Sequence, residues 1–249
     1  MFAALKRKGW DPNIVRLTGT WKDAFACNAT AKKEGKCALV FTCSYSDFFH
    51  EDADRWREDA WEVIRDCQNL VWLILTKRPE RIVEQLPADW GGGYPNVWLG
   101  TTCGTRASYE RIDILRSIPC ALRFLSLEPL LESLQDIDLA GVGWILVGGM
   151  SGPLWKKRTM QIQWASELYD RSKKQESCAY FFKQVSAYRS EWGIDGLGRH
   201  RGEKDKDGKW KLFREFPRTP LPLMPLDIEK GRRFKNDKEW NAYLSQSLR

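Results

Sequence analysis

Six short apolar runs, each followed at once by small, polar or charged residues, constrain the fold more than any other feature of this sequence. The clearest run lies at 144–147, where Trp, Ile, Leu and Val follow one another without alternation. A strand that is buried on both faces has this composition. Gly148 and Gly149 follow the run, and their missing Cβ atoms permit a sharp turn or the close approach of a ligand. The run therefore predicts a central strand that ends in a glycine-rich loop.

The other apolar runs repeat this pattern along the chain. We predict strands at 38–42, 70–75, 96–100, 121–125, 143–147 and 178–182. Between them, the sequence predicts helices at 52–67, 80–85, 106–118 and 159–175, most clearly at 52–67, where apolar residues recur with a helical period. Strands that alternate with helices at spacings of about 20 to 40 residues are typical of repeated βα units and of a parallel sheet.

The ends of the predicted strands favour a barrel over an open sheet. An open doubly wound sheet concentrates its functional residues near one switch point. In this sequence every predicted strand ends in polar residues or glycine, which is typical of a fold whose carboxyl strand ends all face one shared site. We therefore predict an α/β fold, a partial (β/α) TIM-like barrel with about six parallel strands and an irregular C-terminal extension.

The predicted organisation has three parts. Residues 1–36 contain an N-terminal helix and a loop, with about one helical turn near 21–26. Residues 37–185 form the partial barrel, and residues 186–249 form a basic extension rich in Pro and Gly. Because the chain opens on a basic helical fragment with no strand before it, we expect residues 1–36 to continue a first βα unit that is missing from this chain.

Composition and charge exclude some classes of protein and leave others open. No apolar run reaches the length of a membrane span, and residues 1–10 lack the apolar core of a secretion signal. The seven cysteines are odd in number and dispersed, which favours a reducing compartment, so we expect the protein to be cytoplasmic. The net charge of +7 permits a nucleic acid or another polyanion as a partner, although such an excess is common on surfaces that bind neither.

Polar residues at the strand ends form the candidate binding site. Lys77, Arg78 and Lys183 could hold an anionic group such as a carboxylate or a phosphate. Asp47 and Glu128 could bind ribose hydroxyls or an amino group, or act as acid and base. The full set of candidates is Ser44, Ser46, Asp47, Thr76, Lys77, Arg78, Thr101, Thr102, Ser126, Glu128, Gly148, Gly149, Ser151, Lys183 and Gln184. The other interpretation is that these residues only cap helices and solvate loops.

Several familiar sites are poorly supported by the sequence. His50 and His200 are far apart, which argues against a histidine-based zinc site or triad. His50 could act as a base, but we expect it either to contact the start of the helix that follows it or to lie on the surface. Ser151 does not fit the Gly-x-Ser-x-Gly pattern of a nucleophile elbow. The cysteines are not closely spaced as in an iron–sulfur motif, so we expect no metal site.

Six blocks of sequence resemble those of a known family, in order and over roughly residues 38–184. They are Cys-Ser-Tyr-Ser-Asp-Phe-Phe-His-Glu-Asp at 43–52, Thr-Lys-Arg-Pro at 76–79, Asn-Val-Trp-Leu-Gly-Thr at 96–101, Ser-Leu-Glu-Pro-Leu-Leu at 126–131, Val-Gly-Gly-Met-Ser-Gly at 147–152 and Phe-Phe-Lys-Gln at 181–184. The set resembles the phage-associated, radical-SAM-like proteins sometimes called three-Cys-motif proteins, whose function is unknown.

The resemblance implies a partial barrel in which three cysteines hold a [4Fe-4S] cluster that reductively cleaves S-adenosylmethionine. By the same resemblance, Ser44 and Asp47 would contact the methionine amino group, and Gly148 and Gly149 would contact adenine. This chain departs from the family, because the cysteine motif is absent and Met150 stands where the family usually has Glu. We therefore expect no cluster in the chain as given.

Three hypotheses about function follow. The first is a phage or prophage radical-SAM-like protein of unknown substrate, truncated or lacking its cluster loop, with a nucleic acid or nucleotide among its candidate substrates. The alternative is a non-catalytic barrel that binds nucleic acid or a partner protein through its basic face and tail. The third is a cluster-free, phosphate-handling enzyme that uses Lys77, Arg78 and Lys183. The sequence leaves open whether the chain is an enzyme.

Overall fold

The structure, a computed structural model, describes residues 19–43, 46–175, 178–187, 215–219 and 221–224. Residues 1–18, the candidate Ser44 and most of the predicted C-terminal extension lie outside these ranges. Within the described residues, no helix is both long enough and apolar enough to cross a membrane.

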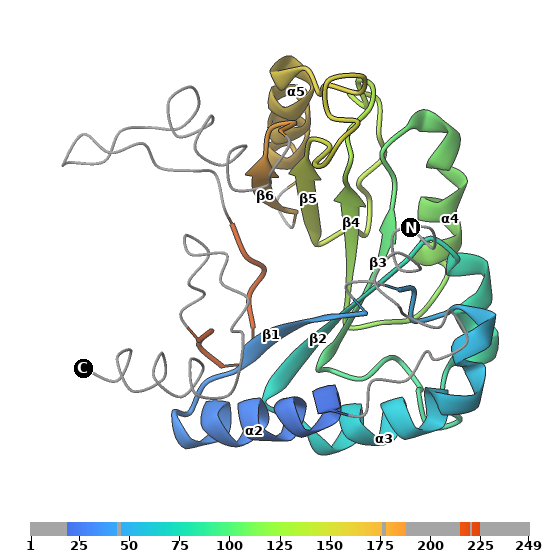
Figure 1. Ribbon diagram of the computed structural model, residues 1–249, viewed down its shortest axis with the longest axis vertical. Coiled ribbons are helices and arrows are strands. Elements are labelled where there is room, and N and C mark those ends of the chain that lie inside the picture. Colours follow the sequence, from blue (N-terminus) through green and yellow to red (C-terminus); the bar gives the residue numbers. More distant parts are fainter. Residues whose placement is uncertain (1–18, 44–45, 176–177, 188–214, 220, 225–249) are drawn as a thin grey trace.

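Six parallel strands form a sheet that curls into a half-barrel (Figure 1). The strands are β1 Ala38–Thr42, β2 Leu70–Thr76, β3 Val97–Thr102, β4 Leu122–Leu127, β5 Trp144–Gly148 and β6 Ala179–Gln184. Each strand pairs with the next one along the chain, so that the order in the sheet is β1-β2-β3-β4-β5-β6. The predicted partial barrel is confirmed, and strands β2 to β6 extend one or two residues beyond their predicted ends.

The helices lie along the outer side of the curl, with the first one before β1 and the others between strands (Figure 1). They are α2 Gly19–Lys33, α3 Arg57–Asp66, α4 Glu110–Arg116 and α5 Ile162–Lys173. Four short 3-10 turns accompany them, η1 Glu51–Trp56, η2 Pro79–Arg81, η3 Val83–Gln85 and η4 Arg106–Ser108. The predicted helix at 52–67 is therefore a 3-10 turn followed by an α-helix, and the one at 80–85 is replaced by 3-10 turns.

The prediction of one helical turn near 21–26 was too short, because α2 runs over 15 residues. Its buried side consists of small side chains. Ala31 is fully buried, and Ala24 and Cys27 pack against the core. Small residues mixed with Thr, Asn and Gly give a weak apolar stripe in the sequence, although they pack closely against a sheet. The sequence pattern therefore did not predict a helix as long as α2.

Both faces of the sheet are covered by apolar side chains. Along β5, Ile145 and Val147 point to the outer core beneath the helices, whereas Trp144 and Leu146 point to the concave side. The concave cluster comprises the buried residues Cys37, Val71, Leu73, Trp98, Phe124, Trp144 and Phe181. This arrangement confirms the prediction that the run at 144–147 is a strand buried on both faces.

Part of the C-terminal extension closes the open side of the half-barrel, and we call residues 215–219 and 221–224 the closing segment. At one end, the Glu215 backbone N–H donates to the Tyr180 carbonyl over 2.8 Å, beside β6. At the other end, Cys37 pairs with Leu223 in an isolated parallel bridge, beside β1. Figure 1 shows the segment between these two edges of the sheet. Because Tyr180 and Cys37 lie near the amino ends of β6 and β1, the segment covers that end of the concave face.

Phe216 provides a test of this closure. Its ring centroid lies 5.7 Å from that of Trp144 and 5.4 Å from that of Phe181. We expect Phe216→Ala to lower the free energy of unfolding by about 2 kcal/mol, less than for a fully buried Phe because this residue is half-buried. Urea denaturation followed by circular dichroism measures the change. Leu221→Ala, an exposed position in the same segment, should cost much less, and equal losses would contradict a packing role for Phe216.

Candidate functional site

The candidate residues at the carboxyl strand ends separate into two groups, because side chains alternate between the two faces of a strand. One group lies on the outer rim of the sheet, around the ends of β1, β2 and β3. The other group lies on the concave side, at the ends of β3 to β6. The two groups have different partners, so each is described separately.

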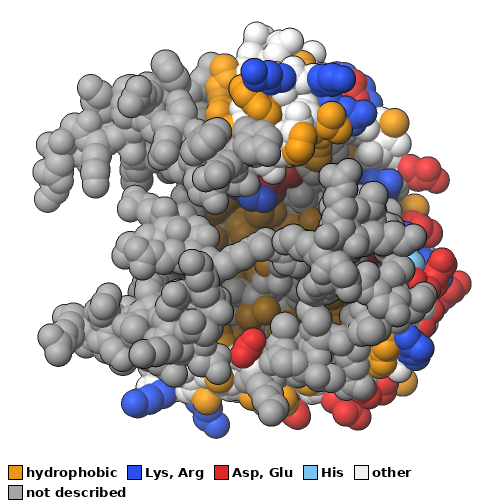
Figure 2. Space-filling view, viewed as in Figure 1, with side chains coloured by type: hydrophobic (Ala, Val, Ile, Leu, Met, Phe, Trp, Pro, Cys, Tyr) orange, Lys and Arg blue, Asp and Glu red, His pale blue; other side chains and the backbone are white. Residues whose placement is uncertain are grey.

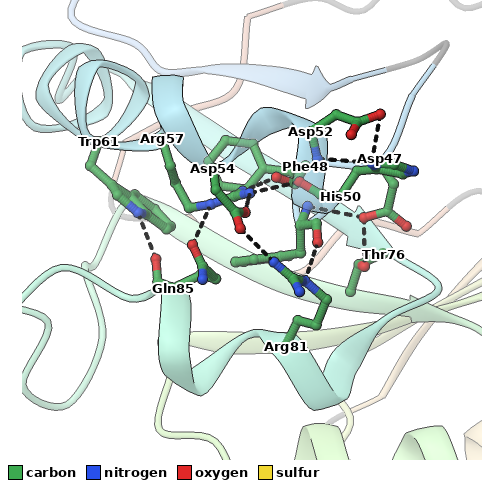
Figure 3. Close-up of polar contacts among 11 residues, drawn as sticks. Asp47, Phe48, His50, Asp52, Asp54, Arg57, Trp61, Thr76, Arg81 and Gln85 are labelled. Carbon is green, nitrogen blue, oxygen red and sulfur yellow. Dashed lines mark hydrogen bonds and ion pairs between the residues drawn. The ribbon is translucent and has the colours of Figure 1, made fainter.

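Asp47 is the centre of the rim group, and its carboxylate is fully engaged within the protein. Its Oδ1 accepts hydrogen bonds from the Thr76 hydroxyl (2.7 Å) and the Phe49 backbone N–H (3.0 Å). Its Oδ2 accepts from the Lys77 backbone N–H (2.9 Å) and lies 3.5 Å from Arg78 Nη1. Figure 3 shows Asp47 beside Thr76. The carboxylate therefore ties the loop after β1 to the end of β2, rather than pointing free oxygens at a ligand.

The threonines of the rim also bind backbone groups. The Thr76 hydroxyl accepts a hydrogen bond from the Arg78 N–H (2.9 Å). The Thr101 side chain is fully buried, and its hydroxyl donates to the Thr76 carbonyl (3.0 Å). Thr101 thus faces the outer core and not the concave side. The geometry gives no support to contacts of Asp47 with an amino group or of Thr101 with a substrate.

Arg57 fixes the loop that carries Asp47, and nothing in the sequence distinguished it. Its guanidinium is buried and donates to the carbonyls of Phe48 and His50, to Asp54 (2.6 Å) and to Gln85 (3.0 Å), as Figure 3 shows. A buried guanidinium must be paired and hydrogen-bonded to offset its loss of water. Arg57 therefore holds the 48–54 loop in one conformation.

His50 serves the start of a helical turn, as expected. Its Nδ1 accepts a hydrogen bond from the Asp52 backbone N–H over 3.2 Å, which caps η1. A side-chain acceptor at this position satisfies one of the free N–H groups at the beginning of the turn.

On the concave side, Glu128 and Lys183 form an ion pair across the end of β5. Glu128 Oε2 lies 2.9 Å from Lys183 Nζ, and the two side chains are 15% and 50% exposed. Gly148 lies between them in the sheet, and a Cβ at Gly148 would be 2.8 Å from Glu128 Oε2. Gly148 therefore makes room for the Glu128 carboxylate.

Gly149 and Ser151 likewise pack against the protein itself. A Cβ at Gly149 would lie 2.3 Å from the Ser186 backbone nitrogen, and Ser151 pairs with Ala187 in an isolated bridge. The Ser186 hydroxyl accepts from the N–H groups of Met150 (3.1 Å) and Met160 (2.9 Å). The glycine-rich loop thus folds onto the residues that follow β6.

Three buried polar atoms near the carboxyl ends have no hydrogen-bond partner among the described residues. They are the hydroxyls of Thr42 and Thr102 and Oε1 of Gln184, whose Nε2 donates to the Gly149 carbonyl over 3.2 Å. By strand alternation Thr102 lies on the concave side, and the parallel register places it beside Ser126. An unpaired buried hydroxyl costs about 1–3 kcal/mol, so Thr102 marks a place where a ligand or water would gain a hydrogen bond.

We call Thr102, Ser126, Glu128 and Lys183 the concave polar site. All four were among the sequence candidates, whereas Asp47, Thr76 and Thr101 were candidates that turn out to bind the protein backbone. The concave polar site combines two hydroxyls with one acidic and one basic side chain, and apolar Leu146 lies on the same face. These side chains can bind a ligand that has one positive charge, one negative charge and an apolar part.

The cysteines do not form a ligand set for a [4Fe-4S] cluster. Within the described residues, which include all seven cysteines, no three Cys, His, Asp or Glu side chains come together as a metal site. Burial raises the pKa of the Cys103 thiol to about 11, and burial is also the largest influence that raises the pKa of Cys43. Burial therefore favours the protonated form of both thiols at neutral pH.

Three comparisons with known proteins were made. A family model described as a protein of unknown function (DUF5131) matches residues 6–235. Neither the search of curated proteins nor the search of solved structures found a match. The comparisons therefore supply a family but no activity.

Asp54 supplies a test of the network around Arg57. Burial acts to raise the pKa of Asp54, but the hydrogen bonds from Arg57 and Arg81 outweigh it and hold that pKa below its ordinary value. A lowered pKa in the folded state stabilises the fold at pH values above the ordinary pKa, and this stabilisation is lost as the pH falls through the lowered value.

We therefore expect Asp54→Asn to lower the free energy of unfolding at pH 7 by about 1 kcal/mol, a modest amount because Asp54 is 39% exposed and solvent screens its charge. The difference from the unsubstituted chain should shrink as the pH falls below the lowered pKa. Denaturant unfolding at several pH values measures it. Glu62→Gln, an exposed position on α3, is the control. A loss that does not change with pH would exclude the ionised carboxylate as its cause.

Proposed function

The chain belongs to this family of proteins of unknown function, and we propose that its half-barrel binds a small zwitterionic molecule of the S-adenosylmethionine type at the concave polar site. The observation that carries the proposal is the Glu128–Lys183 ion pair at the carboxyl end of a parallel half-barrel. Ligands of such barrels bind at this end of the strands. The resemblance of the six sequence blocks to radical-SAM-like proteins, phage-associated by that resemblance alone, supports the same class of ligand.

The chemistry of the pair matches the methionine end of such a molecule. Glu128 can accept hydrogen bonds from an ammonium group, and Lys183 can donate to a carboxylate. The hydroxyls of Thr102 and Ser126 lie on the same face, where the first lacks a partner among the described residues. The half-buried side chain of Leu146 offers apolar contact to the rest of the ligand.

The energies favour exchange of the pair for a ligand. Because Lys183 is half exposed, its ion pair contributes only about 0–1 kcal/mol to stability. Each hydrogen bond between a charged protein group and a charged ligand contributes about 1.5–3 kcal/mol. These contacts exceed the cost of separating Glu128 from Lys183, and they offset part of the entropy that the ligand loses on binding.

We propose binding without reductive cleavage of the ligand. The described cysteines do not provide the ligands of an iron–sulfur cluster, so no radical step is assigned to these residues. The proposal leaves the substrate of any further reaction unassigned.

Two other functions have less support. A phosphate at Lys77, Arg78 and Lys183 would be repelled by two carboxylates, because Asp47 lies beside Arg78 and Glu128 lies beside Lys183, whereas a zwitterion can use both charges of such a pair. A polyanion bound by overall charge would not be attracted to the described barrel, since its residues carry as many acidic as basic side chains. The net charge of +7 therefore comes from residues outside the described ranges.

Equilibrium dialysis with S-adenosylmethionine, and with methionine as the minimal zwitterion, tests the proposal. We expect Glu128→Gln and Lys183→Met each to weaken binding at least about tenfold, because each removes one charged contact. Matched controls are Glu110→Gln and Lys174→Met, which change exposed charges on α4 and at the end of α5. Circular dichroism checks that the variants fold.

Two results would contradict the proposal. An unsubstituted chain that binds neither compound would exclude this class of ligand. Binding that survives in both site variants as well as in the controls would place the ligand elsewhere.

A further inference from the structure

The connection between β5 and α5 contains a turn with three consecutive basic residues. Lys156, Lys157 and Arg158 follow one another there and are all exposed. No acidic side chain among the described residues pairs with any of them. By contrast, Arg65 and Arg116 are each paired with acidic residues. The three charges are therefore available to an anionic partner.

Apolar side chains accompany these charges. Leu154 is 51% exposed, and Trp155 is only partly buried. Lys156 Nζ lies 5.6 Å from the centroid of the Trp155 ring. We call residues 154–158 the basic turn. Figure 2 shows basic side chains next to hydrophobic ones at the end of the molecule where α5 lies.

The basic turn is held at both ends, which reduces the entropy that binding would cost. The Trp155 N–H donates to the Gly152 carbonyl (3.1 Å), and the Lys157 N–H donates to the Leu154 carbonyl (3.0 Å). After the turn, the Thr159 hydroxyl donates to the Trp155 carbonyl (2.9 Å). The next residue, Met160, is buried and is bound to Ser186. The cations and the ring are thus presented from a fixed backbone.

We infer that the basic turn is a contact surface for single-stranded nucleic acid. Such a strand presents phosphates at regular intervals together with flat bases that stack on aromatic rings. Lys156, Lys157 and Arg158 match the phosphates, and Trp155 matches a base. A duplex would leave the ring without a partner, and a membrane surface would require a longer amphipathic element than this turn.

The inference goes beyond the proposed ligand site and does not depend on it. The basic turn follows β5 at the same end of the sheet as Glu128 and Lys183. Its charged residues take no part in the described contacts of the concave polar site. Loss of nucleic-acid binding and loss of small-ligand binding can therefore be separated by mutation.

The experiment measures fluorescence anisotropy of a labelled oligo-dT or oligo-U of about 20 nucleotides with the full chain, over a range of salt concentrations. We expect the triple variant Lys156→Gln, Lys157→Gln, Arg158→Gln to weaken binding at least about tenfold at about 0.1 M salt. The slope of log K against log salt should fall by about 2, because each phosphate contact contributes about 0.7 for a single strand.

Trp155 is tested separately from the charges. Trp155→Ala should weaken binding about fivefold or more with the salt slope unchanged, and Trp155→Phe should restore most of the loss, since it keeps an aromatic face. The control is Lys32→Gln, Lys33→Gln, Lys174→Gln, which removes the same charge from exposed positions on α2 and at the end of α5. The variant with Gln at 156, 157 and 158 should still bind S-adenosylmethionine as tightly as the unsubstituted chain does.

Several outcomes would overturn the inference. One is an absence of binding to either oligonucleotide by the unsubstituted chain. Another is an equal effect of the two triple variants, which would show attraction by overall charge alone. Duplex DNA that binds as tightly as the single strand, with no effect at Trp155, would exclude base stacking. Binding of anionic vesicles, lost in the triple variant and accompanied by no oligonucleotide binding, would assign the turn to a membrane surface.

Discussion

The parallel pairing of all six strands, in the order in which they occur along the chain, is the constraint on which the rest of this structure depends. A parallel sheet must be covered on both faces, because its strands carry apolar side chains on each. Helices cover the outer face, and large side chains such as Trp98, Trp144 and Phe181 fill the concave one. The closing segment completes this cover near the amino ends. Every strand then delivers its last residues to one edge, and the candidate site lies at that edge.

The side-chain alternation of each strand divides this edge into two chemically different parts. Residues that point outward, such as Thr76 and Thr101, bind backbone groups of neighbouring strands and loops. Glu128 and Lys183 point inward and meet across Gly148. Polar residues on the rim therefore bind the protein backbone, whereas those on the concave side form the site at which we propose that a ligand binds. The basic turn adds a third surface at the same end of the molecule.

The sequence predicted the strands and the edge that carries the site, because apolar runs and the polar residues after them are local signals. It did not predict which side chains share a face of the sheet, since a shift of one residue moves a side chain to the other face. Asp47 and Thr101 illustrate this limit. Arg57 was missed because its hydrogen bonds run to the carbonyls of Phe48 and His50, which only the folded loop directs toward its guanidinium. The closing segment was missed because Leu223 pairs with Cys37, from which it is far apart in the sequence. The length of α2 was missed because its buried side is built from small residues.

The most direct test of the account is hydrogen–deuterium exchange of the full chain with and without S-adenosylmethionine, read by mass spectrometry. We expect slower exchange in peptides that cover 126–131, 146–151 and 181–185, where Glu128, Gly148 and Lys183 lie. We expect no change in peptides that cover 46–57 and 76–81, where Asp47 and Arg57 already bind the protein. Protection confined to the 46–57 and 76–81 peptides, or no protection at a saturating ligand concentration, would contradict this expectation.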